Sequence, residues 1–142
     1  MIARYYSNDI DRVYKIEQEE ENSWIKNQFY AYDMDSLESM SYIYLFNSEV
    51  IGYLMSKIIL DEVHIHNITV SKEYRNNGVG TDMITCLIDK AKDKNKNKIC
   101  LEVNNNNLIA RKVYNKFRFT KVGVRKKYYN NKNDAVLMDL WI

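Results

Sequence analysis

A pair of glycines at the start of a predicted helix is the first feature of this sequence that could bind a ligand. Gly78 and Gly80 stand one residue apart in YRNNGVGTDMITCLIDKAK (74–92), although the chain has four glycines in all. Without a Cβ atom, glycine lets another molecule approach the main chain closely. The unpaired N–H groups of a first helical turn attract anions, aided by the helix dipole, and Arg75 can add a cation. The pattern Arg-x-x-Gly-x-Gly therefore predicts a phosphate site, although a Gly-x-Gly on its own is more often a turn that opens a helix.

Two better-known phosphate loops do not fit this stretch. GVGTDM lacks the third glycine of the dinucleotide-binding fingerprint, and no Gly-Lys-Ser/Thr follows as in a P-loop. The pattern that remains is strand, short linker, Arg-x-x-Gly-x-Gly and helix.

A second group of residues could carry acid–base chemistry. Asn107 and Tyr114 in NNLIARKVYNKFRF are seven residues apart, which is two helical turns and places them on one face. Glu102 lies within the apolar strand ICLEV, where an ionised carboxylate is costly unless another group uses or satisfies it. Taken singly, Tyr114 could be a half-buried core tyrosine and Glu102 half of a structural salt bridge. Their combination with the glycine loop favours a catalytic site.

The elements that would position these residues alternate between strands and helices. We expect a mixed α/β (α+β) sheet with helices packed on its faces, and a helix N-cap at Ser7 or Asn8. Asn47-Ser48-Glu49 predicts a hairpin. The expected strands are 2–5, 41–47, 50–60, 63–70, 98–104, 119–129 and 134–142, and the expected helices run to about 20, over 24–32, and from 78 and 107.

Composition limits the class of protein. The 142 residues are 46% hydrophobic and 28% charged with a net charge of +2, which is typical of one soluble globular domain over residues 1–142. No apolar run reaches the ~18 residues of a membrane span, and MIARYYSND lacks a signal-peptide core. Cys86 and Cys100 form no metal pattern and are expected to be reduced, buried thiols of a cytoplasmic protein.

Together these motifs resemble the GNAT superfamily of N-acetyltransferases. IHNITVSKEYRNNGVGTDMI, then LEV, then NNLIARKVYNKFRF carry the resemblance. Within the superfamily, the chain is most similar to bacterial ribosomal-protein-alanine N-acetyltransferases, on VYKIEQ, IILDE and KKYYNNKNDAVLMDL. The resemblance implies a mostly antiparallel sheet that splays at two central parallel strands, 63–70 and 98–104, with helices on both faces.

The resemblance also implies which residues bind acetyl-CoA between the splayed strands. Main-chain groups of one strand would hold the pantetheine arm and the acetyl group, the N–H groups from Asn76 to Thr81 would hold the pyrophosphate, and Asn107 would bond the pantetheine arm. The implied binding residues are Ile68, Thr69, Val70, Arg75, Asn76, Asn77, Gly78, Val79, Gly80, Thr81 and Asn107.

The implied reaction is aminolysis of a thioester, in which an ammonium group must lose a proton and the departing thiolate must gain one. Glu102 would be the base, through water, and Tyr114 the acid, because the tyrosine pKa of about 10 lies above that of a thiol. No metal is required. A protein N-terminus, most directly that of a ribosomal protein beginning with alanine, would be the acceptor.

The chain departs from the resembled pattern at two places. Arg118 stands where the family usually has glycine, so a positive φ there would carry a modest strain. Tyr128-Tyr129 is followed by Asn130-Asn131 where a proline is frequent in close relatives, and this loop would lie near the acceptor.

Other readings stay open. His64 and His66 share one side of a strand but lack a third metal ligand, and His64 could instead share proton removal. RKKYY (125–129) combines basic and aromatic residues, yet the near-neutral chain favours an edge strand over nucleic-acid binding. The acceptor could be a lysine, a polyamine or an antibiotic amine, and a non-catalytic acyl-CoA-binding module is the remaining class. The sequence gives no oligomeric state.

Overall fold

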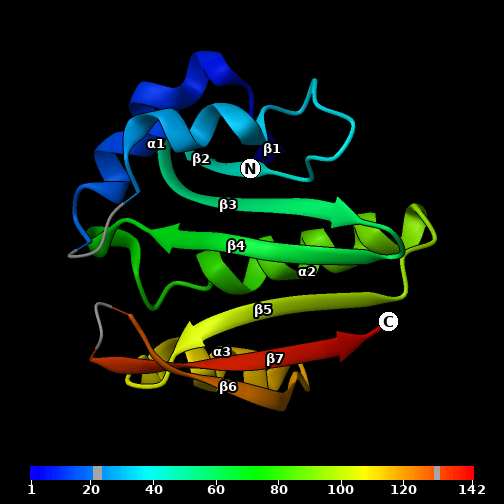
Figure 1. The fold of residues 1–142 in the computed structure, drawn as a ribbon. Helices are drawn as coiled ribbons and strands as arrows, with labels where there is room; N and C mark the ends of the chain where they lie inside the picture. The colour runs from blue at the N-terminus through cyan, green and yellow to red at the C-terminus, as the bar shows by residue number, and fades with distance from the viewer. Residues whose placement is uncertain (21–23, 130–131) are drawn as a thin grey trace.

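Seven strands hydrogen-bond into one sheet in the computed structural model, which describes residues 1–20, 24–129 and 132–142 (Figure 1). The elements in chain order are β1 (Ile2–Arg4), η1 (Ser7–Asp9), α1 (Ile10–Glu17), η2 (Lys26–Tyr32), β2 (Tyr42–Phe46), β3 (Glu49–Ile59), β4 (Glu62–Val70), η3 (Lys72–Tyr74), α2 (Val79–Asp93), β5 (Lys98–Asn104), α3 (Leu108–Lys116), β6 (Thr120–Tyr129) and β7 (Asn133–Trp141). Asn130 and Asn131, at the place where close relatives often have proline, lie outside the described residues.

The strand order is β1-β2-β3-β4-β5-β7-β6, and the neighbouring strands are antiparallel except for β4 and β5. The parallel pairing runs from Glu62–Lys98 to Ile65–Leu101 and is not continued over 66–70 and 102–104. Figure 1 shows the two ribbons diverging toward their arrowheads. The predicted splay at two central parallel strands is confirmed, and β6, which contains RKKYY, is an edge strand as predicted.

Helices cover both faces of the sheet, as predicted. On one face, α2 and α3 pack Met83, Leu87 and Tyr114 against strand residues such as Leu101. On the other face, α1 and η2 pack a second core, with Val13 and Phe29 among its members. This second core lies against β1, β2 and β3, so the same face of β5 and β7 is not covered by it.

A bulge in β4 sets the direction of the side chains near the splay. Ile65 pairs with Ser56 and Asn67 pairs with Met55, so His66 is an extra residue opposite β3. A bulge puts two residues against one and re-aims the side chains that follow. His66 contacts η2 and Asn67 contacts α1, although they are neighbours in the chain.

Two local predictions differ from the structure. The predicted N-cap at Ser7 or Asn8 is wrong, because 7–9 form a 3-10 turn and Asp9 is the N-cap of α1. The helix also ends at Glu17 and not near Glu20. The predicted hairpin is confirmed: Asn47 and Ser48 both have positive φ, as a two-residue type I′ turn requires. Within the described ranges, no helix combines the length and apolarity needed to cross a membrane.

Candidate active site

The N-terminus of α2 presents an anion cradle. Gly78 is its N-cap with a left-handed φ of 81°, and no side chain caps the helix. Among the described residues, the main-chain N–H groups of 76–81 have no hydrogen-bond acceptor, and the first helical bond in this stretch joins the Asp82 N–H to the Gly78 carbonyl. Free donors at a positive helix end suit a phosphate group.

Each glycine of the motif has its own physical reason. The φ of Gly78 strains any L side chain, and a Cβ atom there would meet nothing within 4 Å, so the space above the loop is open. Gly80 is helical, and its Cβ atom would meet Val70 at 3.9 Å, an ordinary contact. The protein itself therefore does not demand glycine at Gly80. A ligand lying on the first turn of α2 does supply a reason for it.

The Arg75 side chain is already engaged by other residues and is not free to bind a ligand in this cradle. Its Nε donates to the Val70 carbonyl at 2.9 Å and its guanidinium pairs with Glu20. Asn77 is also used locally, because its Nδ2 donates to the carbonyls of Tyr74 and Arg75. The positive character of the cradle therefore comes mainly from the helix end, and Arg75 orders the chain that leads into it.

The end of β4 offers main-chain groups to a ligand. Ile68, Thr69 and Val70 pair with β3 along one edge of β4, whereas the edge that faces β5 has no strand partner over 66–70. Main-chain groups along such an edge can bind an extended ligand as an added strand would be bound. The open edge leads directly from the parallel strands toward the cradle of α2.

Helix α3 positions Asn107 and Tyr114. Asn107 is the N-cap and accepts a hydrogen bond from the Ala110 N–H at 3.1 Å, so its Nδ2 is the group left to donate to a ligand. Tyr114 is buried on the α2 side of the sheet, 5% exposed, and its ring lies 5.6 Å from that of Phe119. Burial, reinforced by Tyr129, raises the Tyr114 pKa well above its usual value.

Glu102 faces the opposite side of the sheet from Tyr114. Its neighbours Leu101 and Val103 belong to the core beneath α2 and α3, so alternation along β5 directs Glu102 to the other face. There it lines a groove of about 740 Å³ and accepts from the Arg125 Nε at 3.0 Å. A substrate that meets both Glu102 and Tyr114 must therefore lie in the opening between β4 and β5.

Tyr129 is a site residue that the sequence analysis did not select for chemistry. It lies in the groove, and its pKa is raised to about 12 by burial and then by the Glu102 carboxylate. Tyr129 also contributes to the raised pKa of Tyr114. Tyr129 therefore interacts electrostatically with both Glu102, the candidate base, and Tyr114, the candidate acid. The signal that could have found it was the pair Tyr128-Tyr129 in an otherwise basic edge strand.

The two histidines are separated by their partners. The Nδ1 of His66 lies 2.7 Å from the Tyr32 hydroxyl, and burial lowers the His66 pKa. His64 lies beside Glu62 and Cys100 in the groove. The expectation that no further potential metal ligand lies near the histidines is therefore wrong for His64. Cys86 and Cys100 are free, as predicted, but half-buried and not fully buried.

The chain matches known proteins over most of its length. The model of the acetyltransferase (GNAT) family matches residues 8–119. A putative [ribosomal protein bS18]-alanine N-acetyltransferase of Bacillus subtilis (strain 168) is 32% identical over 136 residues, which cover 94% of this chain and 89% of the relative.

Two solved structures share the fold. The ribosomal-protein-S18-alanine N-acetyltransferase of Escherichia coli superposes with a TM-score of 0.94 at 25% identity, covering 100% of this chain and 93% of that one. NAA60 of Arabidopsis thaliana, solved in complex with acetyl-CoA, has a TM-score of 0.90 at 18% identity, covers 100% and 99%, and shows the fold alone. The family match spans more than half of the chain and the Bacillus relative nearly all of it, so this chain belongs to the acetyltransferase (GNAT) family.

Proposed function

We propose that residues 1–142 form one domain that transfers the acetyl group of acetyl-CoA to the N-terminal α-amine of a protein. The most direct acceptor is a ribosomal protein that begins with alanine, met in the cytoplasm. The observation that carries the proposal is the opening between β4 and β5, with Glu102 in the groove on one face of the sheet and Tyr114 in the core on the other face. The acceptor assignment rests on the relatives named for ribosomal-protein alanine acetylation.

Acetyl-CoA, the acetyl donor, could bind to main-chain groups of the site that have no partner among the described residues. The first turn of α2 would bind the pyrophosphate through the N–H groups of 76–81, and the open edge of β4 over Ile68–Val70 would hold the pantetheine arm. Asn107 would add a side-chain donor from α3. With the donor bound in this way, the thioester would lie at the splay, because the edge of β4 connects the cradle to the parallel strands.

Glu102 and Tyr114 would divide the two proton transfers. Glu102 removes a proton from the acceptor's ammonium group through water, and the amine nitrogen then attacks the acetyl carbonyl carbon. As the C–N bond forms and the C–S bond breaks, Tyr114 gives its hydroxyl proton to the sulfur, and the second proton that the nitrogen loses on becoming an amide restores that hydroxyl through water. Burial keeps that proton on Tyr114 at neutral pH, and the same desolvation raises the proton affinity of the departing thiolate.

The groove does not select a polycationic acceptor by charge. Its carboxylates Glu62, Asp139 and Glu102 each lie within 3.4 Å of a basic group, Lys98 for the first two and Arg125 for the third. The carboxylates are thus largely neutralised before a polyamine arrives. An N-terminus carries one ammonium group and can use the rest of the groove for its peptide chain.

The test is an acceptor panel with acetyl-CoA. Peptides that begin with alanine, serine or methionine, a peptide with a blocked N-terminus and an internal lysine, and spermidine are incubated with the protein, and fragment-ion mass spectrometry locates the acetyl group. We expect acetylation of the α-amine, fastest on alanine. Faster transfer to the internal lysine or to spermidine would overturn the acceptor assignment, and no transfer to any amine would overturn the enzymatic one.

A further inference from the structure

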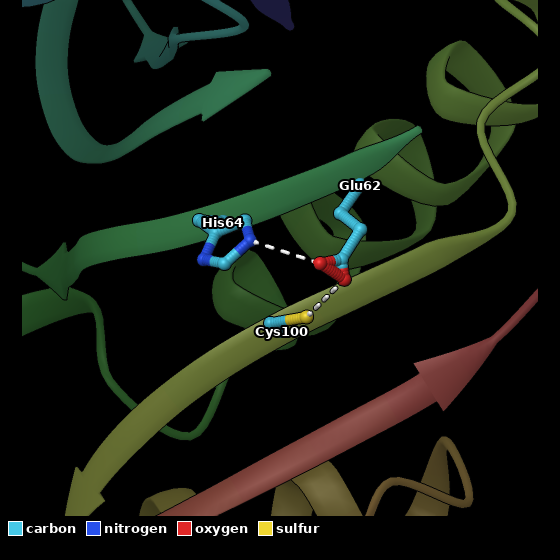
Figure 2. Close-up of side chains that lie close together, drawn as sticks. All are labelled: Glu62, His64 and Cys100. Carbon is cyan, nitrogen blue, oxygen red and sulfur yellow. Dashed lines mark hydrogen bonds and ion pairs between the residues drawn. The ribbon is translucent and has the colours of Figure 1, made fainter. Parts of the chain in front are cut away.

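Three potential metal ligands of different chemistry meet on the groove face of the parallel strands. Glu62 and His64 come from β4 and Cys100 from β5, and His64 is paired directly with Cys100 in the strand register (Figure 2). One ligand atom from each residue lies within 4.8 Å of the other two. The cluster combines imidazole nitrogen, thiol sulfur and carboxylate oxygen, the donor types that Zn²⁺ uses in proteins.

Two distances within the cluster are similar to the separation of ligand atoms around a tetrahedral metal. His64 Nε2 lies 3.6 Å from one Glu62 carboxylate oxygen, and Cys100 Sγ lies 3.7 Å from the other. Zinc bonds of 2.0–2.3 Å at tetrahedral angles separate the ligand atoms by about 3.3–3.8 Å. Because the two distances involve different carboxylate oxygens, a metal would be held through both oxygens of Glu62 or after a turn of that carboxylate.

His64 supplies an independent indication. Its Nε2 atom is buried and has no hydrogen-bond partner within the described part of the chain. A buried polar atom without a partner carries a desolvation cost, so it requires an explanation. In Figure 2 this nitrogen points toward the Glu62 carboxylate and the centre of the cluster. A metal ion there would be the missing partner.

Lys98 is the group that competes with a cation. Its Nζ lies 2.9 Å from Glu62 and 3.4 Å from Asp139, and it sits 4.9 Å from the centre of the Trp141 ring. Asp139 and Trp141 can hold the ammonium group if Glu62 turns to a metal. The site can therefore exchange one cation contact for another without leaving Lys98 unpaired.

We propose that Glu62, His64 and Cys100 form a binding site for Zn²⁺ or a similar borderline-soft divalent cation, with the fourth position open to the groove. His64 binds through the lone pair of neutral Nε2 and Cys100 as a thiolate, so each ion bound releases the thiol proton to solvent. These three residues line the same groove as Glu102, but the proposal gives the ion no role in acetyl transfer and does not depend on which amine is the acceptor.

The test uses tag-free protein, because a polyhistidine tag binds the same metals. Isothermal titration with Zn²⁺, in two buffers of different ionisation enthalpy, measures stoichiometry and proton release, and Co²⁺ substitution tests for a thiolate-to-metal absorption band. We expect one ion per chain, about one proton released, and a thiolate band.

Variants locate the ligands. Cys100→Ser should abolish the thiolate band, and His64→Ala should weaken binding by more than about 100-fold, since even outer-sphere partners of a metal contribute 10–100-fold. Cys86→Ser and His66→Ala are the matched controls, one thiol and one imidazole outside the cluster, and both should bind like wild type; circular dichroism checks that each variant is folded. Absence of one-to-one binding by wild type would overturn the proposal, as would a thiolate band that survives in Cys100→Ser or is lost in Cys86→Ser.

Discussion

Glu102 and Tyr114 differ in solvent contact as well as in position. The Glu102 side chain is 28% exposed and paired with Arg125, whereas Tyr114 is 5% exposed and packed within the α2–α3 core. A base must exchange protons with the acceptor and solvent, so partial exposure suits Glu102. An acid that protonates a buried thiolate is better shielded from water. At the residue scale, the difference in burial therefore supports the proposed roles, Glu102 as the base and Tyr114 as the acid.

We expect Glu102→Gln to lower turnover by about 10²–10⁴, the usual contribution of a general base. Binding of acetyl-CoA, measured by calorimetry, should remain close to wild type because Glu102 acts on the acceptor. Glu62→Gln, assayed without added metal, is the matched control, since it removes another carboxylate from the same groove. Near-wild-type turnover in Glu102→Gln would exclude Glu102 as the base, and His64→Ala in the same assay would then test His64.

Tyr114→Phe should lower the turnover number while the acceptor's KM changes little, the pattern of an interaction made in the transition state. The ring that packs against Phe119 is retained, so the fold should survive. With a thioester whose leaving thiol is more acidic, the defect should shrink, because that thiolate needs less protonation. An equal loss with both donors would mean that the hydroxyl positions the donor and is not the acid.

At the scale of the element, the ends of helices hold the site in place. Helix α3 ends in a Schellman motif: Phe119 N–H bonds the Tyr114 carbonyl and Arg118 N–H bonds the Asn115 carbonyl. The Tyr114–Phe119 ring contact is the hydrophobic pair that accompanies this motif. Arg118 occupies the left-handed position at φ 70°, which confirms the strain expected from the missing glycine. The same turn that strains Arg118 also fixes Tyr114.

Arg118→Gly should stabilise the protein by about 0.5–1 kcal/mol. Left-handed backbone costs an L residue about 1–2 kcal/mol, and the greater freedom of glycine in the unfolded chain offsets about 0.5–1 kcal/mol of that gain. Asn95→Gly is the matched control, because Asn95 has the equivalent position after α2 at φ 59° and asparagine tolerates this conformation better. Urea unfolding measures the free energy of unfolding of both variants. An increase in Arg118→Gly no larger than that in Asn95→Gly would contradict the prediction.

Gly80→Val tests the anion cradle without disturbing the fold. The position is helical and a Cβ atom has room beside Val70, so the unliganded protein should keep its stability. The branched side chain should nevertheless obstruct the pyrophosphate. At an acetyl-CoA concentration of ~100 times Kd, the free energy of unfolding of wild type should rise by about 2.7 kcal/mol. This rise increases the Tm of wild type, and the variant should show no such increase. Gly78→Val would be less clean because of its positive φ.

Gly123→Val is the control for this experiment. Gly123 lies in β6, where a Cβ atom would make an ordinary contact with Leu137 at 3.9 Å. This variant should retain the full ligand-induced shift. A full shift in Gly80→Val as well would remove the phosphate role of the loop.

At the scale of the whole molecule, a buried polar network joins α1 to the strands that splay. The Glu17 carboxylate, 3% exposed, accepts hydrogen bonds from the Tyr53 hydroxyl of β3 and the Asn67 amide of β4. The Thr69 hydroxyl then donates to Asn67 at 3.1 Å. These hydrogen bonds connect the bulge of β4, and the edge over 68–70 that we propose binds the donor, to helix α1.

The network makes stability depend on pH. Burial raises the Glu17 pKa above its ordinary value of 4.5, although Tyr53 and Asn67 lower it in part. The contribution of a group with a raised folded-state pKa is fully present below the unfolded pKa and is lost as pH rises through the folded pKa. Wild type should therefore lose stability relative to Glu17→Gln as pH rises above about 4.5.

Urea unfolding of both proteins over a pH series measures this difference, with the exposed Glu49→Gln as the control for a carboxylate that is not buried. A difference between wild type and Glu17→Gln that is independent of pH, or that changes in the opposite direction, would contradict the assignment.

The sequence by itself determined the order of the elements, the glycine loop at the start of α2 and the placing of Asn107 and Tyr114 on one helix. These features depend on residues close together in the chain, through apolar periodicity, turn chemistry and helix capping. The strain at Arg118 was expected from the resemblance to the family, which usually has glycine there, and the turn after α3 has the positive φ that this expectation required.

Only the tertiary structure decided which distant side chains meet. His64 and His66 are equivalent by spacing, and their rings lie 6.4 Å apart in the same groove. Tyr32 of η2 nevertheless contacts the Nδ1 atom of His66, while the β4–β5 register places Cys100 opposite His64. Likewise, Arg75 is engaged by Glu20, 55 residues earlier in the chain. Strand register and long-range pairing depend on how all the side chains of both cores pack together. A short stretch of sequence does not include these distant packing partners.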